Sequence, residues 1–69
     1  MRIVVINPNT TASMTAVIDS AARTVARPDA EIVSVTSTMG PASIESHYDE
    51  ALAVPGVLAA IADHPGADG

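Results

Sequence analysis

Hydrophobic and polar positions change their period along the first half of this chain. Residues 3–6 are a continuous run of β-branched apolar side chains, which predicts a strand over residues 2–6 buried on both faces of a parallel sheet. Apolar residues then recur at steps of three and four, which predicts a helix over residues 14–27 packed on that sheet. Pro28 ends this helix, because the residue before a proline disfavours the helical region.

The two faces of this helix follow from the same pattern. The stripe expected to face the sheet consists of Met14, Val17, Ile18, Ala21, Ala22, Val25 and Ala26. The face expected to be in water consists of Thr15, Asp19, Ser20, Arg23, Thr24 and Arg27. On that face Asp19 and Arg23 stand four positions apart with the acid first, which is the better orientation for an ion pair.

The second half of the chain repeats the order of strand and helix. Apolar residues Ile32, Val33 and Val35 predict a strand over residues 31–36, and a glycine-proline pair marks the loop over residues 37–43. Ser46 is placed to cap a following helix, with an acidic residue three positions later. Residues 54–56, Val-Pro-Gly, are expected to interrupt that helix, and the proline then opens another at its first position. Residues 68–69 read as the approach to a third strand.

The order β-α-β-α predicts an α/β fold, the start of a parallel, flavodoxin-like sheet. Two parallel strands do not make a complete sheet, because such strands need cover on both faces and usually further neighbours. We therefore expect residues 1–69 to be the N-terminal part of one α/β domain, truncated before a third strand that lies beside the first. A chain of this kind exposes an unpaired strand edge.

Composition narrows the range of partners. The net charge is −5 and arginine is the only strongly basic residue type, which argues against nucleic acids and anionic membrane surfaces as partners. No apolar segment approaches the length of a membrane span, so no membrane association is expected. The absence of cysteine fits a reducing compartment, and a cytoplasmic location is expected. His47 and His64 have no second ligand at metal-binding spacing, so we expect both in solvent and no metal site.

A polar loop, Asn-Pro-Asn-Thr-Thr at residues 7–11, follows the first strand directly. Open α/β sheets bind ligands outside the carboxyl ends of their strands, and the first amides of a helix favour an anion there. Asn9, Thr10 and Thr11 add donors without charge, which suits a carboxylate, a ring carbonyl or a developing enolate. A plain structural alternative stays open: Thr11 or Ser13 caps the helix, and Asn-Pro forms a turn.

A second loop, Gly-Pro-Ala-Ser-Ile-Glu at residues 40–45, follows the second strand and lies beside the first loop if the strands are neighbours. The plain alternative is a connection that ends in a helix cap. The acids Glu45, Asp49 and Glu50 fit a solvated helix start better than a catalytic carboxylate pair. Tyr48 is the only aromatic residue, and such a residue more often packs in a core than contacts a ligand.

Residues 2–11 with 13–15, and residues 40–45 with 48–51, resemble the N-terminal part of the aspartate/glutamate/hydantoin racemase superfamily. The resemblance is strongest to the hydantoin and allantoin racemase branch and covers nearly the whole chain in the same order and spacing. It implies two similar α/β halves with the active site between them. One cysteine from each half acts on the α-carbon without a cofactor: one removes its proton and the other returns a proton on the opposite face. It also implies a small-molecule substrate, a hydantoin or an amino-acid derivative, and a homo-oligomeric parent protein.

The resemblance assigns substrate binding to Asn9, Thr10, Thr11, Ser43, Ile44 and Tyr48. Both catalytic cysteines are expected beyond Gly69, so no catalytic residue is assigned within the chain, and the chain alone is expected to be inactive. Two alternatives stay open. One is a sister activity on the same scaffold, an arylmalonate decarboxylase or a maleate isomerase. The other is a truncated, non-catalytic binding module.

Overall fold

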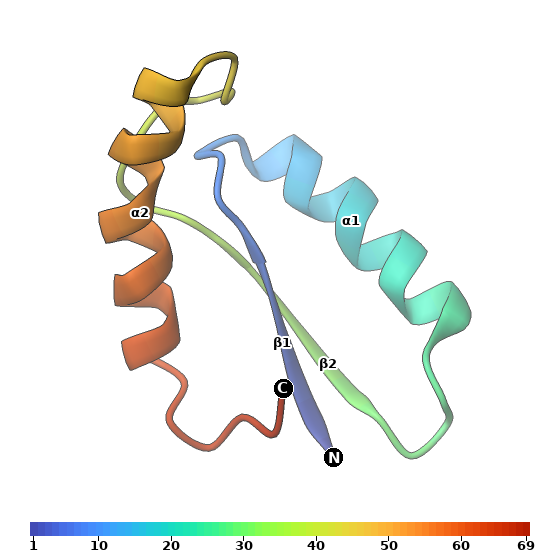
Figure 1. Ribbon diagram of the computed structural model, residues 1–69. Coiled ribbons are helices and arrows are strands. Elements are labelled where there is room, and N and C mark those ends of the chain that lie inside the picture. The colour runs from blue at the N-terminus through green and yellow to red at the C-terminus, as the bar shows by residue number, and fades with distance from the viewer.

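The computed structural model describes all 69 residues, and its elements follow the predicted order. Strand β1 spans Arg2–Asn7, helix α1 spans Ala12–Val25, strand β2 spans Glu31–Thr36 and helix α2 spans His47–Ala62. The predicted α/β fold with the order β-α-β-α is therefore confirmed (Figure 1).

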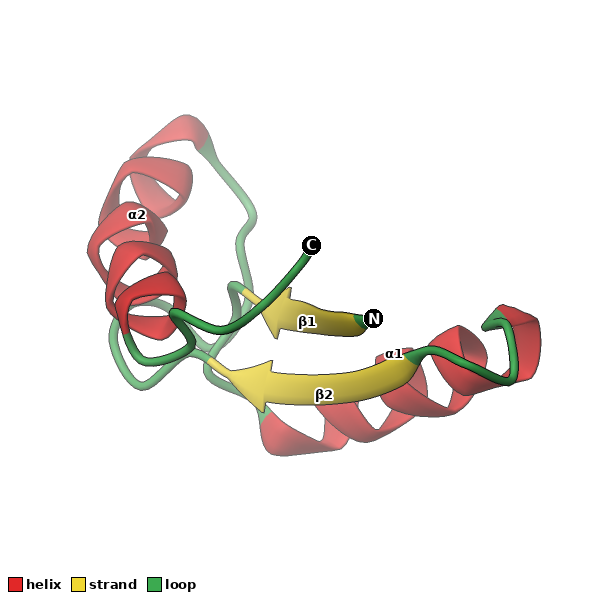
Figure 2. Cartoon of the chain, turned by 90° about the horizontal axis from the view of Figure 1, so that it is seen from below, coloured by secondary structure: helices red, strands yellow, loops and turns green.

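β1 and β2 are neighbouring parallel strands, in a register that pairs Ile3 with Ile32 and Asn7 with Thr36. Figure 2 shows α1 and α2 on opposite sides of this two-stranded sheet. Side chains alternate along a strand, so β1 presents Ile3 and Val5 towards α1 and its intervening residues towards α2. Because the strands are parallel, both carboxyl ends lie at the same end of the molecule.

The last residues of the chain run along the edge of β1 that β2 leaves free. Gly69 donates its N–H to the carbonyl of Arg2 at 3.3 Å, and its carbonyl accepts the N–H of Val4 at 2.7 Å. The Asp68 carboxylate accepts the N–H of Arg2 at 2.7 Å. Gly69 thus bonds to Arg2 and to Val4, two positions of β1 that are one residue apart from Ile3 on either side. This is the hydrogen-bond pattern of parallel strands. This is the edge at which the sequence places a third strand.

The predicted faces of α1 are partly wrong. Val17 and Val25, expected to face the sheet, are 70% and 83% exposed. Thr15, expected in water, is buried, and the side chains of Asp19 and Arg23 bond to β2. The helix turns this flank towards the sheet because its hydroxyl, carboxylate and guanidinium groups find hydrogen-bond partners on β2. Helical periodicity does not distinguish the two flanks of an apolar stripe.

α1 also begins and ends two residues earlier than predicted. Thr11 stands at its N-cap, and Ala26 has an extended backbone with ψ of 147°. The Ala26 N–H still bonds to the Ala22 carbonyl at 3.0 Å, but the chain then leaves the helix before Pro28. The restriction that proline places on its neighbour therefore acts together with an extended residue one step earlier.

The predicted interruption of the second helix is wrong, because α2 continues through Pro55. α2 keeps its course because small residues allow it to lie against the segment after β2. Ala53 and Gly56 are buried, and a Cβ atom at Gly56 would collide with the Ser37 hydroxyl and the Met39 carbonyl. Packing at this contact outweighs the local signal of the Val-Pro-Gly sequence.

The hydrophobic core of these residues is very small. Only six of the 69 residues are buried, and Ile32 and Ala53 are the hydrophobic side chains among them. Large apolar side chains of both helices are exposed, including Val17 on α1 and Leu58 on α2. Neither helix has the length and apolar character needed to cross a membrane.

Candidate functional site

Two loops meet at the carboxyl end of the sheet. The first loop, residues 8–11, leads from β1 into α1, and the second loop, residues 37–46, leads from β2 into α2. Figure 1 shows both loops at the end of the molecule opposite to the two chain termini. This is the end at which open parallel sheets bind ligands, so the predicted site residues are brought to the expected place.

Three hydrogen bonds join the two loops. The Thr10 N–H donates to the Pro41 carbonyl at 3.1 Å, and the Thr11 hydroxyl donates to the Ala42 carbonyl at 2.8 Å. The Ile44 N–H donates to the side-chain oxygen of Asn9 at 2.9 Å. Residues about 30 positions apart in sequence therefore form one hydrogen-bonded unit, which fixes the position of each loop relative to the other.

The first loop is anchored from below by Asn7, the last residue of β1. Its side chain is the most deeply buried of the chain, at 1% exposure. The carboxamide oxygen accepts the N–H of Asn9 at 3.0 Å, and the nitrogen donates to the Thr11 carbonyl at 3.2 Å and to the Thr15 hydroxyl at 3.0 Å. Sequence reasoning named this residue only as part of the motif. An asparagine that ends an apolar strand is a signal that could have singled it out.

Several donors of the predicted site are left without a strong partner. The Asn9 amide nitrogen has only the Met14 sulfur, a weak acceptor, at 3.8 Å. The hydroxyls of Thr10 and Ser43 make no hydrogen bond within the chain. The first turn of α1 carries no acidic side chain, so the positive end of its dipole is not neutralised locally. Such donors suit a neutral or negatively charged oxygen of a ligand.

Thr11 occupies the N-cap position of α1, yet its side chain forms no capping hydrogen bond. Its hydroxyl is instead committed to the Ala42 carbonyl of the second loop. The interpretation of Thr11 as a side-chain cap is therefore wrong: its oxygen accepts no N–H from the first turn of α1, and its hydroxyl donates to the second loop. Thr11 is a link between the loops.

Ile44 and Tyr48 differ in their surroundings. The Ile44 side chain shares an apolar hollow of about 280 Å³ with Pro8 of the first loop and with Ala53 and Leu58 of α2. Tyr48 lies in the first turn of α2 and is 73% exposed, so the alternative that it packs in a core is wrong. Ile44 thus helps to seat the first loop, whereas the Tyr48 side chain is exposed and makes no hydrogen bond with either loop.

The acidic residues at the start of α2 form a helix cap. The Asp49 N–H donates to the Ser46 hydroxyl at 3.2 Å, and the Asp49 carboxylate accepts the Glu45 N–H at 3.1 Å. Glu50 pairs with the fully exposed ring of His47 at 3.2 Å. This arrangement confirms the predicted cap and the exposure of His47, and it accounts for these carboxylates without a catalytic pair.

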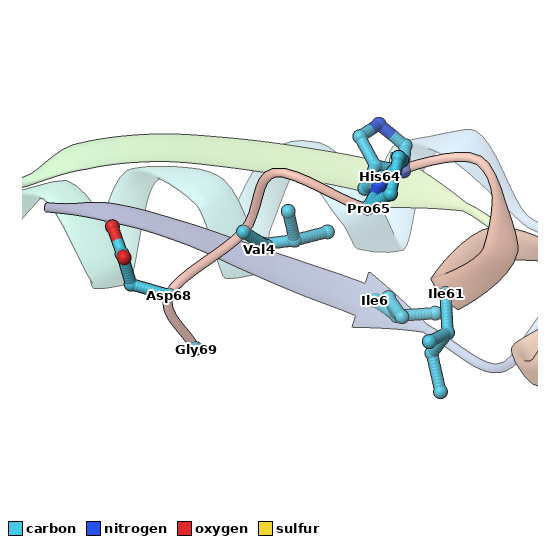
Figure 3. A pocket seen from close by; sticks show the side chains of 8 residues that line it. Val4, Ile6, Ile61, His64, Pro65, Asp68 and Gly69 are labelled. Atoms are coloured by element: carbon cyan, nitrogen blue, oxygen red, sulfur yellow. The ribbon is translucent and has the colours of Figure 1, made fainter.

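A separate cavity of about 350 Å³ lies between β1 and the end of α2 (Figure 3). It is lined by Val4 and Ile6 of β1, by Ile61 of α2, and by His64, Pro65, Ala67, Asp68 and Gly69 after α2. The His64 ring is half-buried and lies 2.9 Å from the Ala60 carbonyl, so its expected exposure to solvent is wrong. None of the predicted site residues lines this cavity.

Comparison with known proteins gives consistent matches. The sequence model of the Asp/Glu/Hydantoin racemase family matches residues 3–69. A hydantoin racemase of Pseudomonas sp. strain NS671 is 60% identical over 58 residues, which are 84% of this chain and 23% of that protein. A hydantoin racemase of Rhizobium meliloti is 48% identical over 61 residues, 88% of this chain and 25% of that protein.

A solved structure matches the whole chain in fold and in sequence. Allantoin racemase from Klebsiella pneumoniae superposes with a TM-score of 0.96 at 51% identity, covering all of this chain and 29% of that one. The chain spans about a quarter of the length of the curated relatives it matches.

Proposed function

The chain belongs to the Asp/Glu/hydantoin racemase family, and we propose that it supplies the substrate-holding loops of a racemase for 5-substituted hydantoins or allantoin. Membership in this family implies a small-molecule substrate. The observation that carries the proposal is the joined pair of loops at the carboxyl ends of two parallel strands, with side-chain donors at Asn9, Thr10 and Ser43 that have no strong partner. We propose Thr11, Ile44 and Tyr48 as the supporting residues of the same site.

The proposed reaction moves one proton at a ring carbon beside a carbonyl group. A base removes that proton, and the electron pair of the broken C–H bond moves towards the carbonyl, whose oxygen becomes negatively charged. An acid on the opposite face then returns a proton to the carbon, and nothing is oxidised or reduced. Donors aimed at the carbonyl oxygen bind it more strongly as it becomes an enolate, which lowers the barrier. Asn9 and Thr10 are proposed to supply these donors.

The proton-transfer groups are assigned to two cysteines by the family resemblance, and residues 1–69 contain none. We propose that the 69 residues belong to a longer α/β domain in which a third strand pairs along β1, where Asp68 and Gly69 already bond. Cofactor-independent chemistry, a homo-oligomeric assembly and a cytoplasmic location complete the proposal.

A chimera tests this proposal. In the hydantoin racemase of Pseudomonas sp. strain NS671, the 58 matching residues are replaced by the corresponding residues of this chain. Racemisation of an enantiopure 5-substituted hydantoin, and of enantiopure allantoin, is followed by chiral chromatography against a no-protein control. We expect the folded chimera to racemise at least one of these compounds. A folded chimera without activity, beside an active parent enzyme, would reject the proposed function.

A further inference from the structure

The buried hydrogen-bond network beneath the first loop extends beyond Asn7. The Thr15 hydroxyl, which accepts from Asn7, lies 2.6 Å from the Thr36 hydroxyl, so these two groups also share a hydrogen bond. Asn7 ends β1, Thr15 lies in the first turns of α1, and Thr36 ends β2. One chain of side chains therefore connects the three elements whose ends define the site.

Two of the three hydrogen bonds of the Asn7 carboxamide hold the main chain of the first loop. Its oxygen holds the N–H of Asn9, and its nitrogen holds the carbonyl of Thr11. These main-chain groups flank Thr10 on both sides, so the path of the loop at Thr10 is fixed from within the sheet. The network contains no buried polar atom without a partner. Fully satisfied buried networks of this kind rigidify the groups they hold.

We propose that Asn7 is a positioning residue for the substrate, held in place by Thr15 and Thr36; this rests on the function proposed above. Asn7 is too deeply buried to touch a ligand at 1% exposure. It acts through Asn9 and Thr10, whose donors it places at a defined distance from the ends of both strands. Small displacements matter here, because catalysis depends on donors aimed at the atom that gains charge.

The sharpest variant is Thr15→Val in the chimera, because valine keeps the shape of threonine and removes only the hydroxyl that links Asn7 to Thr36. Thr15→Ser restores a hydroxyl at the same place. Thr24→Val is the matched control: it makes the same change on the exposed face of α1, where the hydroxyl bonds only to the Ser20 carbonyl. Asn7→Ala is the more direct change, but it leaves several buried groups unpaired and endangers folding.

Two readouts separate positioning from mere stability. The first is kcat and KM at a temperature well below the melting temperature of every variant. We expect Thr15→Val to lower kcat/KM by about 10- to 100-fold, as displacements of about 1 Å do. We expect Thr15→Ser to restore most of this loss, and Thr24→Val to leave both constants unchanged.

The second readout is hydrogen exchange of the main-chain amides of Asn9, Thr10 and Ile44, which needs no activity. We expect Thr15→Val to speed exchange at these amides while the β1–β2 amides keep their protection. An inactive but folded chimera would count against the proposed function, and the exchange result would still decide the positioning role. If Thr15→Val lowers the melting temperature but leaves kinetics and loop exchange at control values, the positioning role is refuted.

Discussion

At the scale of single residues, the two loops combine side chains whose hydrogen bonds hold the loops together with side chains whose donors have no strong partner. Asn9 does both: its oxygen accepts from the Ile44 N–H, while its nitrogen has only a sulfur atom at 3.8 Å. The Thr11 hydroxyl donates to the second loop, whereas the Thr10 hydroxyl makes no hydrogen bond within the chain. Adjacent positions of one motif therefore have different tasks.

The two halves of the Asn9 carboxamide can be separated by substitution. In the chimera, Asn9→Asp keeps an acceptor for Ile44 and removes the free donor, whereas Asn9→Ala removes both. We expect both variants to lower kcat by about 10²–10³-fold, the usual cost of one donor to a developing oxyanion. We expect Asn9→Asp to keep more of the loop order, seen as slower exchange at the Ile44 amide. An unchanged kcat/KM in Asn9→Ala would remove Asn9 from the binding loop.

At the scale of elements, a polar contact ties α1 to the outer edge of β2. Asp19 accepts from Arg23 at 2.9 Å and from the Ser34 hydroxyl at 2.6 Å, and Arg23 also donates to the Ile32 carbonyl at 2.9 Å. Hydrogen bonds from Arg23 and from Ser34 lower the pKa of the Asp19 carboxyl below its ordinary value. Arg23 thereby covers a main-chain acceptor at an edge that otherwise invites pairing with another strand.

Because the pKa of Asp19 is lowered, this contact should stabilise the fold less as the pH falls. A carboxyl whose pKa is lower in the folded state stabilises the fold above its ordinary pKa of about 3.9 and loses that contribution as the pH falls through the folded value. Between about pH 5 and pH 3, we expect the melting temperature of the chimera to fall further than that of its Asp19→Asn variant. Asp29→Asn, in the connection between α1 and β2, is the control and should behave as the unsubstituted chimera. Parallel pH profiles for Asp19→Asn and the chimera would show that the contact does not contribute.

The order and type of the elements could be predicted from the sequence, but the orientation of the helices could not. The parallel strand at residues 3–6 was predictable, but these residues are only half-buried rather than buried on both faces as predicted. The cap at Ser46 is a local sequence signal, and the structure confirms it. The burial of Thr15 and the exposure of Val17 depend on partners in β2, which a helical period does not contain. Likewise α2 continues through Pro55 because Gly56 fits against Ser37, a contact between distant positions.

The location of the candidate site was predictable for the same local reason, since a polar loop after a buried strand marks the end of a parallel sheet. Its internal bonding was not. The commitment of Thr11 to Ala42 and of Asn9 to Ile44 requires the two loops to be adjacent in space. The role of Asn7 required knowing that Thr15 and Thr36 lie together.

At the scale of the whole molecule, these residues bury too little to be expected to fold well alone. Six buried residues and a two-stranded sheet are a small core, and Ile6 on the free edge of β1 has no strand beside it. We expect the isolated 69-residue chain to self-associate or to unfold without a sharp transition, as measured by analytical ultracentrifugation and a thermal melt. A clean monomer with a cooperative melt would contradict this expectation.

We propose that these residues hold the substrate of a racemase but do not themselves transfer its proton. The direct measurement is exchange of the α-proton of an enantiopure 5-substituted hydantoin in deuterated water, followed by NMR at equal concentrations of the chimera and the isolated chain. A missing acid or base costs about 10²–10⁴-fold in rate, so the isolated chain should match the no-protein control while the chimera exceeds it. Exchange above that control by the isolated chain, surviving repurification, would contradict the claim and direct attention to His47, Glu45 and Asp49 as bases.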